Sequence, residues 1–176
     1  MRAQWIPKGE FEHILAALKP ENRLACEVSL FTGLRINDVL SLTPEKVRKQ
    51  RFTVREEKTG KTKSVRLPKE LLDRCLLCSG THYIFEHRLD GRKHRTRQAV
   101  YKDMKRVARL FGCKENITPH SARKEYAVEE FNRSGGNLKR VQKLLNHSSE
   151  AVTMLYAMAD IVGKKKRFDK VKKQRV

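Results

Sequence analysis

The segment 118–123, Thr-Pro-His-Ser-Ala-Arg, could bind a phosphate group and move a proton beside it. Thr118 can cap a helix and Pro119 suits the first helical position, so His120 is expected in the first turn. The unpaired backbone N–H groups and the dipole of that turn favour an anion, and Arg123 projects from the same face. The H-x-x-R pattern alone is weak, because a surface arginine near a histidine at a helix start is common.

Two further basic side chains are expected at turns. Arg35 follows a glycine that ends a helix, and its guanidinium can offer a bidentate fork to a phosphate, with Asp38 near enough to hold it in place. The alternative is an ordinary exposed arginine between helices, with Asn37 as a possible cap of the next helix. Lys58 is expected at the tip of a hairpin, where a mobile ammonium group could follow a moving substrate.

Tyr156 follows His147 by nine residues. On one continuous helix this spacing, at about 100° per residue, would leave the two side chains half a turn apart. Ser148 or Ser149 can cap a new helix over residues 150–158, which would let the histidine and the tyrosine face one site. Taken alone, a tyrosine in such a segment is more often a core aromatic residue.

In order and spacing these positions resemble the motifs of the tyrosine recombinase, or phage integrase, family. The family motifs are T-G-L-R, a hairpin lysine, H-x-x-R, and L-x-H followed nine residues later by the tyrosine. The resemblance covers residues 8–160. Ala122, Lys124 and Asn146 stand where the family usually has Leu, His and Gly, and none of these differences removes a reacting group.

The resemblance implies a mechanism that needs no cofactor and no metal ion. The hydroxyl of Tyr156 attacks the scissile phosphate, forms a 3′-phosphotyrosyl bond and frees a 5′-hydroxyl, so that rejoining needs no ATP. Arg35 and Arg123 hold the non-bridging oxygens and neutralise the charge that develops in the transition state. His147 donates a further hydrogen bond.

Lys58 is then the acid for the leaving 5′-oxygen, and His120 is the base or the orienting group for the tyrosine. Two alternatives stay open. A type IB topoisomerase shares this residue set, and a non-catalytic DNA-binding accessory protein would be recognised by a missing catalytic residue.

The segment Cys75-Leu76-Leu77-Cys78 has the spacing of a zinc knuckle, but no second pair of cysteines or histidines follows. Buried thiols in a helix are therefore expected there. Tyr126 is expected in the core.

The charge balance favours a polyanionic partner. The 176 residues include 40 Lys and Arg against 20 Asp and Glu, a formal net charge of +20. Nucleic acid is the commonest partner of so basic a protein. The resemblance implies that this partner is double-stranded DNA and that the protein acts as a homo-tetramer on it. The side chains expected to contact DNA all lie in the basic stretch 88–106: Arg88, Arg92, Lys93, Arg95, Arg97 and Lys102.

No stretch approaches the ~18 consecutive apolar residues of a membrane-spanning helix. The N-terminus shows no apolar signal-peptide core either. We therefore expect no membrane partner, reduced cysteines, and a cytoplasmic, nucleoid-associated protein of a prokaryote or phage host cell.

The elements that must position these residues are mostly helices. We expect a mainly α domain with a small antiparallel β-sheet, and the resemblance implies the tyrosine recombinase catalytic-domain fold. The runs 51–57 and 62–67 predict a β-hairpin, residues 83–85 a short strand and residues 86–97 a surface loop. The helices are predicted from apolar residues at helical spacing: Phe11, Ile14, Leu15 and Leu18; Leu24, Val28 and Phe31, ended by Gly33; Leu71, Leu72, Cys75 and Leu76; Val100, Met104, Val107 and Phe111; Tyr126, Ala127 and Phe131; Leu138, Val141, Leu144 and Leu145.

The predicted domain organisation is simple. We expect one catalytic domain over residues 1–160 and a basic C-terminal tail over residues 161–176. We expect no N-terminal core-binding domain, which most family members carry, in this chain. This fits either an excised catalytic domain or a small single-domain recombinase.

Overall fold

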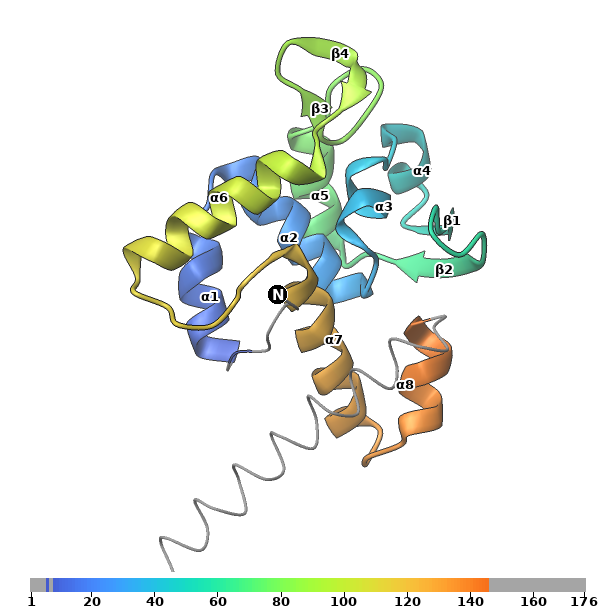
Figure 1. Cartoon of the computed structure of the whole chain (residues 1–176). Helices are drawn as coiled ribbons and strands as arrows, with labels where there is room; N and C mark the ends of the chain where they lie inside the picture. The colour runs from blue at the N-terminus through green and yellow to red at the C-terminus, as the bar shows by residue number, and fades with distance from the viewer. Residues whose placement is uncertain (1–5, 7, 146–176) are drawn as a thin grey trace, which may run out of the picture. The chain divides into compact units, whose positions relative to one another are not determined.

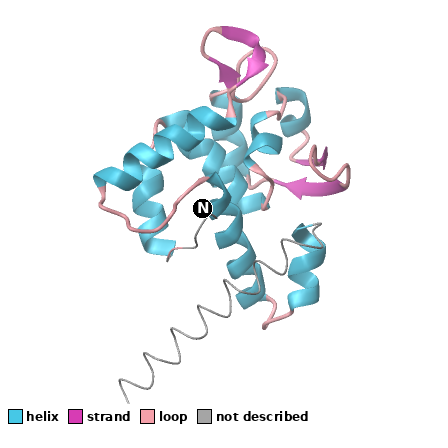
Figure 2. Cartoon of the chain, viewed as in Figure 1, coloured by secondary structure: helices cyan, strands magenta, loops and turns pink. Residues whose placement is uncertain are grey.

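A computed structural model describes residue 6 and residues 8–145 of the chain. The described part is mainly helical and has two antiparallel sheets of two strands each (Figures 1 and 2), which confirms the expected fold class. The helices are α1 (Lys8–Ala16), α2 (Pro20–Thr32), α3 (Ile36–Leu40), α4 (Pro44–Arg48), α5 (Lys69–Leu77), α6 (Arg97–Leu110), α7 (Pro119–Arg133) and α8 (Leu138–Leu145). The strands are β1 (Arg51–Arg55), β2 (Thr62–Arg66), β3 (Glu86–His87) and β4 (Asp90–His94).

The chain consists of two compact units, residues 1–126 and 127–176. Helix α7 begins in the first unit and ends in the second. The predicted domain boundaries stay a prediction. His147, Tyr156, the expected helix 150–158 and the basic tail lie outside the described residues.

One hydrophobic core organises the first unit. All four side chains of the first predicted apolar stripe are buried, but α1 ends at Ala16, so Leu18 packs from the turn that follows the helix. Leu24 and Val28 of α2 are buried as well, but Phe31 is 50% exposed, so its predicted burial is wrong. The buried residues of α2 centre on Ala25 and Ser29, and at 100° per residue Phe31 falls at the edge of that arc.

Of the two short helices α3 and α4, a helix after Arg35 was expected without bounds, whereas α4 was not predicted. Each has five residues, which is too short to show a helical period in the sequence. Asn37 is not a helix cap, because α3 begins at Ile36 and Arg35 occupies the N-cap position. Helix α4 has the expected chemistry of a helix start, with Thr43 accepting a hydrogen bond from the backbone of Lys46.

The prediction for residues 83–97 is wrong in its details. Ile84 and Phe85 lie in a turn rather than a strand, and both are buried, at 1% and 2% exposure. Neighbouring side chains of a strand point to opposite faces of the sheet. Two successive apolar residues are therefore weaker evidence for a strand than apolar residues that alternate with polar ones. The expected surface loop is instead the hairpin β3–β4. Phe111 follows the last residue of α6 and is exposed.

A buried aspartate of α6 holds the start of α2. Asp103 Oδ2 accepts hydrogen bonds from the backbone N–H of Lys19 at 2.9 Å and from Asn22 Nδ2 at 2.7 Å. Asn22 Oδ1 in turn accepts from Arg95 Nε at 2.6 Å. Burial raises the pKa of Asp103, but these hydrogen bonds and Arg106 lower it by more, so the carboxyl group ionises below its ordinary range.

The described part of the second unit is the C-terminal half of α7, a turn and α8. Val141 and Leu145 are buried as predicted, and Leu138 is exposed. The turn between the helices contains Gly135 and Gly136, both at positive φ. No described helix is long and apolar enough to cross a membrane.

Gly33 ends α2 in the left-handed conformation, at φ +67°, as the sequence predicted. It also lies against the ring of Tyr126, because a Cβ atom built on Gly33 would come within 2.4 Å of Tyr126 Cδ1. Tyr126 is half-buried, and Lys63 Nζ lies 5.0 Å from the centre of its ring. This contact brings the end of α2 and the first turns of α7 together.

The substitution Gly33→Ala should therefore cost ~2–4 kcal/mol of unfolding free energy, the sum of left-handed strain and overpacking against the ring. Gly112→Ala is the matched control, because Gly112 has φ +62° but no atom within 4 Å of its Cβ position. The control should cost only ~1–2 kcal/mol. Urea unfolding of the two variants measures the difference, and equal costs would contradict the predicted clash.

Candidate active site

Arg35 is placed by the end of α2 and the start of α3. Gly33 turns the chain, and Arg35 follows as the N-cap residue of α3 with its side chain 7% exposed. Arg35 Nη1 lies 3.0 Å from Glu56 Oε2. None of the three guanidinium nitrogens of Arg35 makes a hydrogen bond of good geometry to a described residue. A buried guanidinium in this state has donors available for an anion.

Arg123 lies in α7, and its side chain also contacts Glu56. Its side chain is 3% exposed, and its Nη1 donates to the carbonyl oxygen of Gly33 at 2.7 Å and to Glu56 Oε1 at 3.3 Å. The start of α7 is built partly as predicted, with Pro119 at its first position. Thr118 does not cap it with its side chain; instead Ser121 Oγ accepts a hydrogen bond from the backbone N–H of Thr118 at 3.2 Å.

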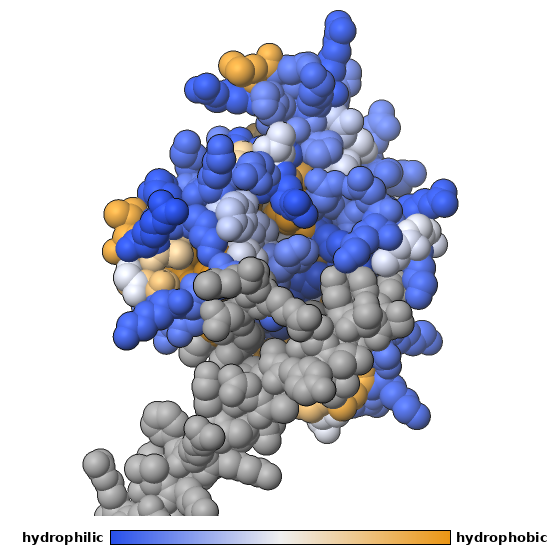
Figure 3. Space-filling model, in the orientation of Figure 1, coloured by the Kyte–Doolittle hydropathy of each residue, from blue (hydrophilic) through white to orange (hydrophobic). Residues whose placement is uncertain are grey.

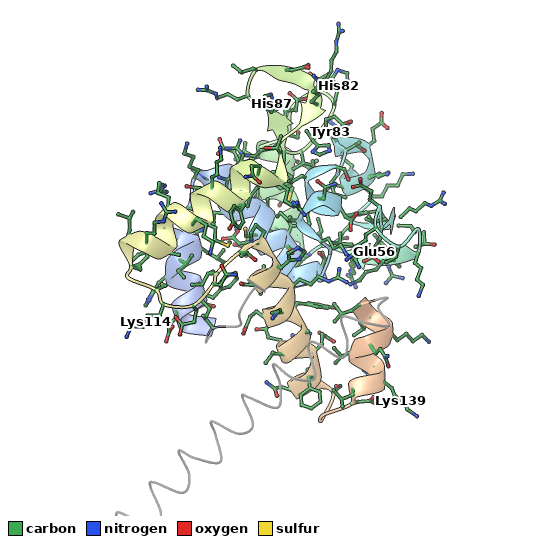
Figure 4. All side chains as sticks on the ribbon, viewed as in Figure 1. Glu56, His82, Tyr83, His87, Lys114 and Lys139 are labelled. Carbon is green, nitrogen blue, oxygen red and sulfur yellow. The ribbon has the colours of Figure 1, made fainter. Side chains whose placement is uncertain are left out.

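Glu56 joins the two arginines and was not among the predicted site residues. It follows strand β1, where Figure 4 labels it, and is fully buried. Its side chain also accepts a hydrogen bond from Thr59 Oγ1 at 2.8 Å. Burial raises the pKa of Glu56, but the Thr59 hydrogen bond and the positive charges of Arg35 and Arg123 together bring it below its ordinary value. The carboxylate is therefore ionised at neutral pH.

A signal for Glu56 was present in the sequence. Along β1, buried Phe52 and Val54 alternate with exposed neighbours. This period of two continues past the end of the strand, so that Glu56 is buried and Glu57 is exposed. An acid on the apolar face of a strand requires a positive partner, which identifies it as a candidate site residue.

Asp38 lies near Arg35, whose positive charge acts to lower the Asp38 pKa, but the expected direct contact is not made, because the ion-pair partner of Arg35 among the described residues is Glu56. Asp38 Oδ1 accepts a hydrogen bond from the backbone N–H of Glu57 at 3.0 Å, and no described residue donates to its Oδ2. Burial raises the pKa of Asp38, and the nearby carboxylate of Glu56 raises it further. The position next to Arg35 is taken by Glu56, and Asp38 instead fixes the backbone of the turn that carries Lys58.

Lys58 lies in the turn between β1 and β2, as predicted, and its side chain is exposed. The turn is closed by hydrogen bonds from Glu56 N to Lys61 O at 2.9 Å and from Gly60 N to Glu56 O at 2.8 Å. His120 lies in the first turn of α7 and is exposed. Of the six predicted catalytic residues, the structure brings Arg35 and Arg123 together on one carboxylate and places Lys58 on the same turn as that carboxylate.

The residues predicted to bind DNA surround the hairpin β3–β4 and the start of α6. Arg88, Arg92, Lys93, Arg97 and Lys102 are exposed. Arg95 is half-buried and contacts Asn22 and Glu21, so it is engaged within the protein. Figure 3 shows a mostly hydrophilic face, with apolar side chains at the β3–β4 turn and the end of α6. The exposed apolar residues at those places are Leu89, Leu110 and Phe111.

A basic groove of about 860 Å³ lies along α6 and the loop that follows it. Arg109 and Lys114, which were not among the predicted DNA-binding residues, line this groove together with Lys102. Among the described lining residues Glu115 is the one acid. Of the predicted catalytic residues that the structure describes, none lines this groove.

The thiols of the Cys75–Cys78 segment are both free. Cys75 is buried in α5, and burial raises its pKa to about 12. Cys78 follows the last residue of α5 and is exposed, so the expectation of two buried thiols is wrong for Cys78. Among the described residues no group of three or more His, Cys, Asp or Glu side chains could hold a metal ion.

Solved structures define the fold class of this chain. A lambda integrase dimer bound to a COC′ core site matches with a TM-score of 0.73 and 23% identity, over 88% of this chain and 59% of that chain. The catalytic domain of bacteriophage HP1 integrase matches with a TM-score of 0.63 and 22% identity, over 89% of this chain and 88% of that chain. The fold is that of tyrosine recombinase catalytic domains.

The family follows from the sequence. The model described as the phage integrase family matches residues 4–161, and the chain belongs to this family. A tyrosine recombinase of Thermosipho africanus is 28% identical over 182 residues, covering 96% of this chain and 61% of that protein. The tyrosine recombinase XerA of Pyrococcus furiosus is 28% identical over 146 residues, covering 78% of this chain and 50% of that protein. The chain thus spans less than two thirds of these relatives.

The two acids of the site should respond to pH in opposite directions. The pKa of Glu56 is lowered in the folded protein, so its contribution to stability is lost as the pH falls through that value. The pKa of Asp38 is raised, so its contribution is largest at low pH and is lost as the pH rises. Between about pH 6 and about pH 3, the stability advantage of the wild type over Glu56→Gln should shrink, while that over Asp38→Asn should grow. Urea unfolding at a series of pH values checks both signs, and parallel curves for the two variants would contradict them.

Proposed function

We propose that this chain is a site-specific DNA recombinase that cleaves and rejoins DNA through a 3′-phosphotyrosyl intermediate. The observation that carries the proposal is the buried pair Arg35 and Arg123, held by one carboxylate beside the turn of Lys58. Apart from its ion pair with Glu56, the buried guanidinium of Arg35 makes no well-formed hydrogen bond to a described residue, and the oxygens of a phosphodiester would supply acceptors. Family membership supports the same reaction.

The proposed reaction exchanges one phosphoester bond for another. The Tyr156 oxygen attacks phosphorus, the bond from phosphorus to the 5′-oxygen breaks, and the phenolic proton passes to His120. Lys58 gives a proton to the leaving 5′-oxygen, and the two arginines stabilise the charge on the non-bridging oxygens. Rejoining runs the same steps in reverse with a 5′-hydroxyl of another strand. His147 is the second histidine of this proposed site.

The substrate we propose is double-stranded DNA, bound by the exposed basic residues around β3–β4 and α6. The net charge of +20 supports this partner. The solved lambda integrase tetramer bound to a Holliday junction supports a homo-tetramer of this chain on DNA. With DNA as its substrate, the protein would act in the cytoplasm of a prokaryotic or phage host cell.

The decisive test of this function is a covalent trap. The chain is incubated with nicked duplexes of random sequence, denatured in detergent and compared with the Tyr156→Phe variant. A protein–DNA adduct should form with the wild type and vanish in Tyr156→Phe, because the phenolic oxygen is the proposed nucleophile. Arg35→Ala and Arg123→Ala should slow adduct formation by ~10²–10³-fold while they keep most of the affinity for DNA.

Each other outcome selects a different function. DNA binding without an adduct from the wild type would favour the accessory protein. An adduct whose only product is relaxed circular DNA, with no strand exchange between two sites, would favour the topoisomerase. Circular dichroism of the arginine variants controls for loss of fold, because both side chains are buried.

The basic surface should contribute affinity in a salt-dependent way. The logarithm of the DNA-binding constant falls linearly with the logarithm of the salt concentration, and the removal of one phosphate contact makes this slope shallower by ~0.9. Arg92→Ala should show this loss, because Arg92 is an exposed residue of β4. Lys69→Ala, an exposed basic residue outside the stretch 88–106, is the single-charge control and should leave the slope unchanged. Equal slopes for Arg92→Ala and the wild type would remove Arg92 from the DNA interface.

A further inference from the structure

We propose that Glu56 is a positioning residue for DNA cleavage, which sets both phosphate-binding arginines and ties them to the turn that carries Lys58. This inference rests on the proposed function and assigns a part of it to a side chain outside the predicted catalytic six. Glu56 itself transfers no proton and forms no bond in the reaction. It acts through the residues that it holds.

Three segments of the chain meet at the carboxylate of Glu56. Oε2 lies 3.0 Å from Arg35 Nη1, at the start of α3, and accepts from Thr59 Oγ1 at 2.8 Å, in the hairpin turn. Oε1 accepts from Arg123 Nη1, in α7, at 3.3 Å. Two oxygens thus connect three segments that are far apart in the sequence. Both guanidinium groups therefore contact this one carboxylate, and Arg123 is also held by the carbonyl oxygen of Gly33.

The negative charge of Glu56 also reduces the repulsion between the two arginines. Two guanidinium groups buried near each other repel, and a low-dielectric surrounding strengthens that repulsion. Glu56 is fully buried between them and offsets one of the two positive charges. The pair keeps a net positive charge, which matches the single negative charge of a phosphodiester. The arginines can therefore stay in place before DNA arrives and still attract it.

Glu56 is also hydrogen-bonded to the turn that carries Lys58. Glu56 closes the turn with its own backbone, through its N–H to Lys61 O and its C=O to the N–H of Gly60. Its side chain accepts from Thr59, the residue after Lys58. A shift of the carboxylate would therefore move the lysine as well as both arginines. One residue coordinates the proposed phosphate clamp and the proposed acid.

Another reading of the same contacts makes the opposite prediction. If Glu56 only occupied the anion site until the phosphate displaced it, removing its charge would speed cleavage. If Glu56 positions the arginines, removing its charge slows cleavage. The rate of the Glu56→Gln variant therefore separates the two readings.

The experiment measures single-turnover adduct formation by the full chain on a nicked duplex recovered from the covalent trap. Glu56→Gln should lower the rate by at least about tenfold and leave the dissociation constant for DNA within about twofold. Glu56→Asp keeps the charge and should recover part of the rate. Glu57→Gln removes the same charge from the neighbouring exposed position and should stay within about twofold of the wild type. A rate for Glu56→Gln equal to or above that of the wild type would overturn the proposal.

A second variant guards against loss of fold. Thr59→Val removes the hydrogen bond to Glu56 Oε2 and leaves the carboxylate and both arginines in the chain. It should lower the cleavage rate several-fold with a wild-type circular dichroism spectrum. An unchanged rate in a folded Thr59→Val protein would contradict the link between Glu56 and the turn.

A readout of the arginines themselves separates this inference from the proposed function. Nuclear magnetic resonance of the Nε–Hε groups should show resolved signals from Arg35 and Arg123 in the wild type and in Glu57→Gln. In Glu56→Gln these signals should move toward those of exposed arginines. No adduct from the wild type would sink the proposed function, whereas unchanged arginine signals in Glu56→Gln would sink the role of Glu56 alone.

Discussion

Two buried guanidinium groups must be kept together against their mutual repulsion, and the arrangement of the site depends on this constraint. Glu56 supplies the opposing charge at 3.0 Å from Arg35 and 3.3 Å from Arg123. Removing one partner of a buried ion pair typically costs about 3–5 kcal/mol, because the remaining charge is left uncompensated. The end of α2, the turn after β1 and the start of α7 are therefore coupled through one carboxylate.

The backbone takes part in the same arrangement. Gly33 ends α2 at a positive φ, and its carbonyl oxygen accepts a hydrogen bond from Arg123 at 2.7 Å. Two residues later the chain reaches Arg35. The Thr-Gly-Leu-Arg segment thus does two things, since its glycine carbonyl orients one arginine while its own arginine provides the other. The ring of Tyr126 against Gly33 keeps this segment close to α7.

Local patterns in the sequence predicted the long helices and the first hairpin. The order and spacing of the motifs indicated which residues to examine as a site. Helical spacing predicted the helices of more than five residues, and the alternation in β1 predicted the first hairpin. Helix α4 and the hairpin β3–β4 are too short to repeat a pattern, so the sequence did not reveal them. Glu56 was missed because two successive glutamates, Glu56 and Glu57, are usually exposed to solvent. Its buried position depends on Arg35 and Arg123, which are distant in the sequence and meet it only in the folded protein.

The hairpin that carries Lys58 has only two strands in the described part of the chain, so each strand has an edge without a backbone partner. Such edges can recruit a strand from another copy and start aggregation. The exposed positions here include Arg51, Arg55 and Arg66. A second copy would bring the same positive charges to the same edge, and like charges directly opposite each other destabilise strand pairing. The basic residues of the hairpin thus protect an open sheet from pairing with itself.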